Sequence, residues 1–345
     1  MCNISAEHLR PLHYPILASY EMGIAFTVLT GGILFNVFTI YALTQTVINS
    51  VLSKTIFYNQ CVFDVIVCVM AIFQLAWSSL QPDMWTKTNA VFCHLVQSGF
   101  FLRWVRVLAL GNIVCQSMNR FWAIVYPYSY KRRTKMYLVI CYVFTFSFSL
   151  MSSLPRAFEV RYCDQICVMT NLAVQLFALH LIDMSMRLLI PIFVTVGLHI
   201  VVMRKLRRLR NEYNSQTRNC PENSDSSRGP PSSVSSNPYS AVWHALSVST
   251  FGFTAELTVL ELTAFIMYLL QGLNRVNFQV DSIARLYYTL VCAMASGLNP
   301  ALEIATVPPL QEYVSQMVIS VWSVLNTFRL PRIKKSLRKS DYVNQ

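Results

Sequence analysis

Charged residues are scarce in this sequence: 13% of its 345 residues are Asp, Glu, Lys or Arg, whereas 54% are apolar. A soluble globular chain usually carries about a quarter charged residues. The shortage is uneven, because long apolar runs alternate with short charged segments. That alternation is typical of an all-α membrane protein that crosses the bilayer several times.

Other expected signals are missing from the sequence as well. The first fifteen residues have no apolar core, so they do not resemble a cleavable signal peptide. No internal repeat indicates a transporter built from two similar halves. Cys163 and Cys167 lack a partner pair or nearby histidines, so no metal site is predicted. Neither a Ser/His/Asp arrangement nor a phosphate loop indicates an enzyme.

Seven apolar segments are each long enough to cross the bilayer, which takes about 20 residues. They are residues 16–43, 55–80, 94–126, 136–154, 171–203, 240–271 and 282–306. We therefore predict a seven-transmembrane helix bundle over residues 16–306, preceded by an N-terminal segment of residues 1–15.

Three segments outside the seven apolar runs have distinct compositions. Residues 204–239 are rich in Ser, Asn and Pro and predict a flexible loop. Residues 307–328 mix apolar and polar side chains after a Pro-Pro break, which predicts an amphipathic helix in the membrane interface. Residues 329–345 form a basic tail.

The placement of basic residues predicts the orientation. The net charge is +12, and the clusters follow the third, fifth and seventh apolar segments. Their members are Lys131, Arg132, Arg133, Lys135, Arg204, Lys205, Arg207, Arg208, Arg210, Arg329, Arg332, Lys334, Lys335, Arg338 and Lys339. Basic clusters flanking apolar helices indicate the cytoplasmic side of a membrane rather than a nucleic-acid surface. We expect the N-terminus outside and the C-terminus inside. The sequon at Asn3 fits an exterior, glycosylated N-terminus.

A set of polar residues and prolines recurs in order along the predicted spans. The set is Asn36, Asp64, Trp85, Cys93, Asn119-Arg120-Phe121, Pro127, Pro191, Ser296, Asn299 and Pro300. In these residues the chain resembles the rhodopsin-like (class A) G-protein-coupled receptors, including the peptide receptors, over residues 16–328. The resemblance implies a multi-pass plasma-membrane receptor that transduces an extracellular ligand to heterotrimeric G proteins.

The sequence also departs from that family. Asn119 stands in place of the acid before the arginine, and His199 and Glu303 stand where tyrosines are usual. The sixth span has no Cys-Trp-x-Pro, and the interval from Cys93 to Arg120 is longer than usual, so a bulge or a displaced disulfide is expected there. These departures leave open a receptor-like protein that does not couple and serves as a decoy, chaperone or heteromer partner.

The resemblance implies that Arg120 lies at the inner end of the bundle and contacts the G protein. Since Asn119 has no charge, we predict that Arg120 forms an inner switch with His199 and Glu303. The alternative is that Glu303 faces interfacial water. The predicted G-protein and switch set is Asn119, Arg120, Phe121, His199, Asn299, Pro300 and Glu303.

Asp64 lies near the middle of the second apolar segment, and an acid at that depth faces the bundle rather than lipid. With Asn36, Ser296 and Asn299 it predicts a buried polar cluster. The cluster either holds a sodium ion, as in relatives of this family, or is a hydrogen-bonded structural site. The sequence alone leaves both readings open.

Ionisable residues also occur in the outer halves of three predicted spans. They are Arg103, Arg106, His180, Asp183, Arg187, Glu256 and Glu261. Charges at membrane depth usually pair, so we expect Arg106 with Glu256 and Arg187 with Asp183. Alternatively, one arginine binds a ligand carboxylate or a polar peptide. A neuropeptide or another polar ligand is favoured over a monoamine.

The intramembrane charges allow one further interpretation of the function. Intramembrane charges also mark ion paths, so a transporter or channel is an alternative, although it requires discontinuous helices or paired repeats.

The resemblance further implies that Cys93 forms a disulfide with Cys163 or Cys167. The remaining cysteine either pairs with Cys2 or leaves Cys2 free.

Overall fold

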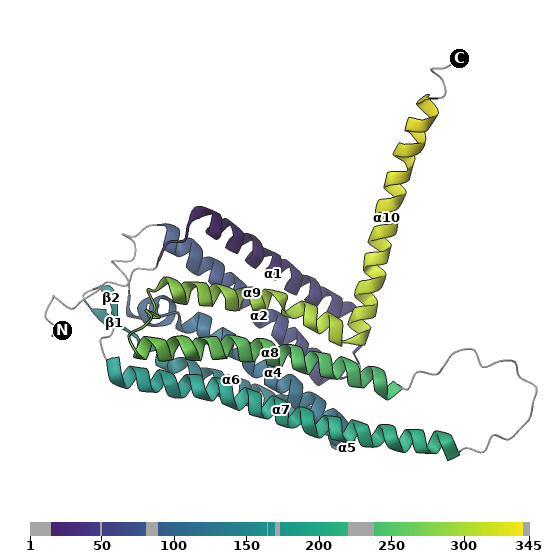
Figure 1. The fold of residues 1–345 in the computed structure, drawn as a ribbon, viewed down its shortest axis with the longest axis horizontal. Helices are drawn as coiled ribbons and strands as arrows, with labels where there is room; N and C mark the ends of the chain where they lie inside the picture. Colours follow the sequence, from purple (N-terminus) through teal and green to yellow (C-terminus); the bar gives the residue numbers. More distant parts are fainter. Residues whose placement is uncertain are drawn as a thin grey trace, which may run out of the picture.

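The computed structural model describes residues 15–48, 50–80, 89–163, 165–169, 173–219 and 238–340. Its long helices before residue 307 pack side by side in one bundle, and the last helix projects away from it (Figure 1). The helices are α1 (Ser19–Gln45), α2 (Val51–Leu80), α3 (Ala90–Phe92), the π-helical turn η3 (Cys93–Gln97), α4 (Phe100–Val125), α5 (Pro127–Arg132), α6 (Thr134–Ala157), α7 (Ala173–Asn219), α8 (Pro238–Gly272), α9 (Ile283–Thr306) and α10 (Pro308–Ser340). The strands are β1 (Val160–Cys163) and β2 (Ile166–Met169).

The membrane spans follow from helix length and composition. In the described part of the chain, five helices are long and apolar enough to cross a membrane, and the number reaches seven if two bent pairs each count as one span. The first pair is α3 and η3 with α4, bent by 42°, and the second is α9 with α10, bent by 99°. Each predicted span coincides with a helix or bent pair, so the seven-helix bundle is confirmed.

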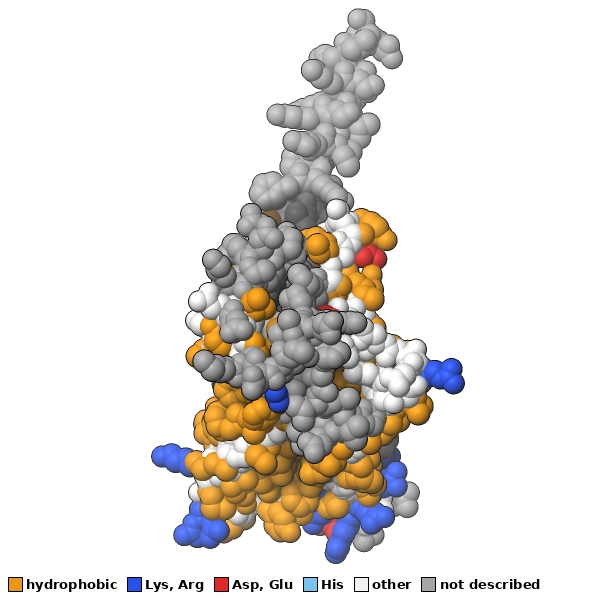
Figure 2. All heavy atoms as spheres, turned by 90° about the vertical axis from the view of Figure 1, so that its left-hand side faces the viewer, with side chains coloured by type: hydrophobic (Ala, Val, Ile, Leu, Met, Phe, Trp, Pro, Cys, Tyr) orange, Lys and Arg blue, Asp and Glu red, His pale blue; other side chains and the backbone are white. Residues whose placement is uncertain are grey.

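The outer surface of the bundle is apolar, and its interior contains charged and polar side chains beside its apolar core. Phe193 and Phe251 are 71% and 77% exposed, whereas Asp64, Arg187 and Glu261 are almost completely buried. A soluble protein shows the reverse distribution. Figure 2 shows hydrophobic side chains over much of the described surface around one end of the bundle. Lipid is the solvent that suits such a surface, and the buried polar groups must then find partners within the bundle.

The two ends of the bundle differ. Strands β1 and β2 form an antiparallel hairpin in which Val160 pairs with Met169 and Cys163 with Ile166. We call this end the hairpin end; it lies on the left in Figure 1. The short helix α5 lies at the opposite end. Helix α4 runs between the two ends and packs against α2, α6 and α7.

The start of α4 explains the long interval between Cys93 and Arg120. The π-helical turn η3 fits extra residues into the helix, and the chain then breaks at Ser98 and Gly99 before α4 begins. Gly99 has φ +73°, a left-handed conformation that glycine adopts without steric cost. Of the two predicted alternatives, the bulge is therefore confirmed.

Two segment boundaries were wrong. Helix α7 continues to Asn219, so residues 204–219 of the predicted loop 204–239 are helical. The side chain of Arg208 pairs with Glu212 one turn later at 3.0 Å, and such pairs support an exposed helix.

The C-terminal boundary also differs. Helix α10 begins at Pro308 and continues to Ser340, so the predicted tail 329–345 is largely helical rather than separate from the predicted helix 307–328. Lys, Arg and Leu, which are frequent in this segment, have high helix propensity. Leu310 is buried against α1, and apolar side chains between Val318 and Val324 are exposed.

Helices α1 and α9 approach each other closely at two glycines. A Cβ atom on Gly32 would lie 2.8 Å from the Cα of Gly297, which is closer than carbon atoms can pack. Small residues allow this kind of backbone contact between membrane helices. The contact fixes α9 against α1 near the polar cluster described below.

Candidate functional site

A cavity of about 50 Å³ lies between the helices at the hairpin end. Its lining includes five arginines from four helices: Arg103, Arg106, Arg156, Arg187 and Arg285. Leu102, Met184, Tyr268, Phe278 and Tyr288 are among the apolar and aromatic residues that complete the wall. Guanidinium groups at membrane depth need anionic partners, so the carboxylates around the cavity determine its charge.

Two buried carboxylates connect three of these arginines into one chain. Asp183 pairs with Arg103 and, at 3.3 Å, with Arg187 Nε. Glu261 pairs with Arg187 Nη1 at 3.1 Å and with Arg106 Nη2 at 2.7 Å. The chain of alternating charges joins α4, α7 and α8. Each of the two carboxylates pairs with two arginines, so no arginine in this chain has a carboxylate that pairs with it alone.

This chain confirms one predicted pair and corrects another. Arg187 does pair with Asp183, as the i, i+4 spacing indicates. Arg106 pairs with Glu261, so its predicted pairing with Glu256 is wrong. Five residues separate the two glutamates, which places them about 140° apart around the helix. Arg106 also lies over the ring of Tyr288, 5.0 Å from its centroid.

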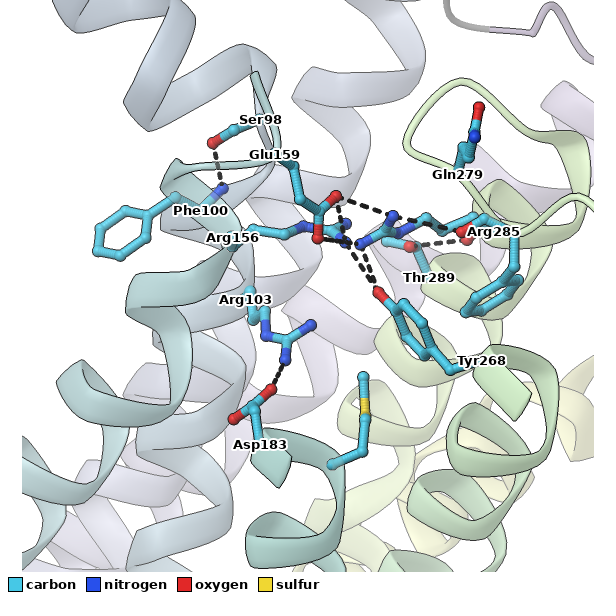
Figure 3. A network of polar contacts seen from close by, with 12 residues as sticks. Ser98, Phe100, Arg103, Arg156, Glu159, Asp183, Tyr268, Gln279, Arg285 and Thr289 are labelled. Atoms are coloured by element: carbon cyan, nitrogen blue, oxygen red, sulfur yellow. Dashed lines mark hydrogen bonds and ion pairs between the residues drawn. The ribbon is translucent and has the colours of Figure 1, made fainter. Parts of the chain in front are cut away.

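A second network surrounds Glu159, which lies between α6 and β1 (Figure 3). Arg285 donates from Nη1 and Nη2 to the two carboxylate oxygens, both at 3.0 Å, and Arg156 Nη1 donates at 3.2 Å. The hydroxyl of Tyr268 accepts from Arg285 at 2.6 Å and from Arg156 at 3.3 Å. One carboxylate thus connects α6 with α9 above the cavity.

The sequence reasoning missed this second network. Arg285 is the fourth residue of the predicted span 282–306, so the rule that ionisable residues inside a span have a role applies to it directly. Arg156 and Glu159 lie just beyond the predicted span 136–154, where charged residues attract no attention. No pattern in the sequence indicates that Tyr268 joins them.

The disulfide fixes the hairpin over this end of the bundle. Cys93 bonds to Cys167, with 5.5 Å between their Cα atoms, which decides between the two predicted partners. Cys163 is disulfide-bonded as well. The predictions for Cys2, Asn3 and Trp85, and for the side chain of His180, fall outside the described residues.

Asp64 and the three residues predicted around it come together in the middle of the bundle. Asp64 Oδ2 accepts from Asn299 Nδ2 and from Gln60 Nε2, both at 3.1 Å. Asn36 Nδ2 donates to the carbonyl of Ser296 at 3.4 Å. Several buried oxygens here have no hydrogen-bond partner in the described part of the chain: Asn36 Oδ1, Asp64 Oδ1, Asn299 Oδ1 and Glu303 Oε1. The cluster is therefore rich in acceptors.

Arg120 lies near the opposite end of the bundle. Its Nη1 donates to Thr250 Oγ1 on α8 at 3.0 Å, and both residues line a small cavity together with His199. Glu303 accepts a hydrogen bond from Cys61 Sγ at 3.3 Å. Among the described residues, Arg120 and Glu303 form no ion pair, so that part of the predicted switch is not observed in this conformation.

Asn119 has a different role from the acid that it replaces. Its Nδ2 donates to Ser53 Oγ at 2.9 Å, and its Oδ1 accepts from the hydroxyl of Tyr130 at 2.6 Å. It therefore connects α4 to α2 and to α5. Phe121 packs edge-on against Tyr126, 5.7 Å between ring centroids. Arg120 and its neighbours thus hold the α4 end to three other helices.

The comparison with protein families finds a match. The model of the 7 transmembrane receptor (rhodopsin family) matches residues 19–302, which is most of the chain. A comparison with curated proteins finds no match. The matched range begins at the first residue of α1 and ends in α9, so it includes the charged cavity, the Asp64 cluster and Arg120.

Proposed function

Because this chain belongs to the rhodopsin family of seven-transmembrane receptors, we propose that it transmits the binding of a polar extracellular ligand to heterotrimeric G proteins. Members of this family are receptors rather than enzymes, and in general their partners are an extracellular ligand and a G protein. The chain is accordingly a multi-pass membrane protein. We further propose that it lies in the plasma membrane and that it couples to a G protein.

Basic residues support an orientation with the hairpin end outside. Lys131 and Arg132 lie on α5 at the opposite end, and the cluster at residues 204–210 lies on the extension of α7. Basic residues favour the cytoplasmic side. In this orientation the charged cavity faces the exterior, where a ligand arrives, and Arg120 lies near the cytoplasm, where a G protein binds.

The observation that carries the proposal is the position of α4. One helix contributes Arg103 and Arg106 to the cavity at the hairpin end and Arg120 to the opposite end. A ligand that alters the ion pairs of the first two arginines acts on the same rigid element that holds the third. Coupling between distant sites requires such a connection.

The contact between Arg120 and Thr250 supports a resting state. It joins α4 to α8, and it takes the place of the customary pairing between the arginine and the preceding acid. His199 and Glu303 remain members of the proposed switch region. His199 lines the same small cavity as Arg120, and Glu303 accepts a hydrogen bond from Cys61. In this proposal activation separates Arg120 from Thr250 and exposes it to the G protein.

The ligand in this proposal is a neuropeptide or another polar molecule rather than a monoamine. Buried charge around the cavity supports a polar ligand, because carboxylates and guanidinium groups there can exchange partners with it. Among the described lining residues, the charged groups are arginines, which would repel an ammonium group.

The Asp64 cluster supports a sodium ion as a second proposal. Its unpaired carboxylate and amide oxygens are ligands of the kind that hard cations prefer. The test compares thermal stability in sodium chloride and in choline chloride. The proposal predicts a saturable sodium effect that Asp64→Asn abolishes, and an equal stability in both salts would contradict it.

Reconstitution tests the receptor proposal. The purified chain is placed in nanodiscs with each class of heterotrimeric G protein, and nucleotide exchange is measured during a screen of peptides and small polar molecules. We expect at least one ligand to accelerate exchange in the wild type and in Glu21→Gln, a half-buried control at the hairpin end that does not line the cavity. Arg120→Ala should abolish the acceleration. Ligand binding without exchange for any G protein would favour a non-coupling decoy, chaperone or heteromer partner.

A further inference from the structure

Charge in the cavity at the hairpin end is not balanced. Its five arginines are paired, among the described residues, with three carboxylates: Asp183, Glu261 and Glu159. These five positive and three negative groups leave a net charge of +2 in a space surrounded by apolar helices. Buried charge without compensation is costly, because the low dielectric does not screen it. An anion in the cavity removes that cost.

Two of the arginines have donors left over. Among the described residues, Arg103 Nε and Arg156 Nε are buried and have no hydrogen-bond partner, and both side chains line the cavity. Arg187 Nε also has no hydrogen bond there, but it lies 3.3 Å from Asp183 Oδ2. Figure 3 shows the guanidinium of Arg103 facing the network around Glu159, to which Arg156 belongs. An arginine offers its donors in a planar fork that matches carboxylate and phosphate oxygens.

The size of the cavity limits the ligand. A volume of about 50 Å³ corresponds to about four water-sized positions. That space suits the two charged groups of a small molecule. We propose that the cavity binds a compact dianion, either a small dicarboxylate or a phosphate, between Arg103 and Arg156. The inference rests on the proposed receptor function and narrows its ligand.

The position of Glu159 leads to a second expectation, which is competition with the ligand. Its carboxylate already accepts from Arg156 and from both terminal nitrogens of Arg285, so it occupies the position that a ligand carboxylate would take. It belongs to the segment between α6 and the hairpin rather than to a helix. Glu159 therefore competes with the ligand for Arg156, and its removal should strengthen anion binding.

The binding test uses the purified full chain in detergent. Thermal stability is titrated with succinate, inorganic phosphate, acetate as the monoanion and succinamide as the neutral control. Succinate or phosphate should stabilise the protein in a saturable manner, at least tenfold more tightly than acetate, and succinamide should have no effect. The first two arms distinguish a carboxylate ligand from a phosphate ligand. Failure of both dianions, or equal binding of acetate, overturns the proposal.

Variants locate the site. Arg103→Gln leaves Asp183 paired with Arg187, and Arg156→Gln leaves Glu159 paired with Arg285, so neither change strands a carboxylate. Each should weaken dianion binding at least tenfold. Arg208→Gln, which removes an exposed arginine on α7, should leave it unchanged. Dianion binding that is insensitive to the first two variants overturns the assignment.

Glu159→Gln distinguishes a binding role from a structural role. It should tighten dianion binding about tenfold, an effect that a damaged fold cannot produce; unchanged or weaker binding contradicts the competition by Glu159. The receptor function is scored separately by nucleotide exchange. Dianion binding without exchange refutes only the receptor function, and ligand-driven exchange without dianion binding refutes only this inference.

Discussion

Replacing Glu261 by glutamine should destabilise the bundle strongly. The carboxylate is 1% exposed and pairs with Arg106 at 2.7 Å and with Arg187 at 3.1 Å. After the change Arg187 still pairs with Asp183. For Arg106, the contact described above that remains is the one with the aromatic ring of Tyr288. Removing one member of a buried ion pair costs about 3–5 kcal/mol, and the cation–π contact, which is present before and after the change, does not alter that loss. We therefore expect a loss of about 3–5 kcal/mol.

Thermal and denaturant unfolding of the purified protein in nanodiscs measures this loss. Glu212→Gln is the matched control, because its carboxylate pairs with Arg208 at 3.0 Å on an exposed part of α7 and should contribute less than about 1 kcal/mol. The double variant Glu261→Leu/Arg106→Leu should recover much of the stability, since it leaves no unpaired charge from that pair. Equal effects of Glu261→Gln and Glu212→Gln would refute the reasoning.

Three further changes probe the fold. Cys93→Ser opens a disulfide with a sequence separation of 74 residues, which should cost about 2–4 kcal/mol; a melting temperature equal to wild type would contradict this. Asn119→Ala removes the acceptor for Tyr130 and should cost about 1–3 kcal/mol and speed hydrogen exchange in α5, whereas unchanged exchange would refute that role. Gly32→Leu should separate α1 from α9 at Gly297 and lower the yield of folded protein; normal yield and stability would contradict the close packing.

Apolar run length explains why the spans could be predicted. Membrane thickness sets the minimum length of each run, and the observed helices agree with the predicted spans wherever lipid defines the boundary. The prediction failed beyond the membrane, at residues 204–219 and 329–340. There the helix continues through charged residues of high helix propensity, and hydropathy carries no information about where it ends.

The rotation of each helix explains the errors within the site. Sequence spacing identified Arg187 and Asp183 as partners because both lie on one helix, where the geometry is fixed. The partner of Arg106 lies on a different helix. Choosing Glu261 over Glu256 requires the rotation and depth of α8 relative to α4, which packing of the whole bundle determines.

Charge alone was also an incomplete guide to partners. The predicted partners of Arg120 are Glu303 and His199, whereas the observed contact on α8 is the hydroxyl of Thr250. A threonine in an apolar span attracts no attention, because its hydroxyl can bond to its own helix. Likewise Gln60 and Asn112 extend the polar cluster around Asp64, although neither is charged.

The most direct test of the receptor account needs no ligand. Thr250→Val keeps the shape of the side chain but removes the hydroxyl that accepts from Arg120 at 3.0 Å. A hydrogen bond to a charged donor contributes about 1.5–3 kcal/mol, so basal nucleotide exchange should rise by about tenfold or more when α4 is released from α8. The measurement is basal exchange on heterotrimeric G proteins by wild type, Thr250→Val and Thr250→Val/Arg120→Ala. The account predicts a rise in the single variant that the second change abolishes; equal rates for all three would contradict it.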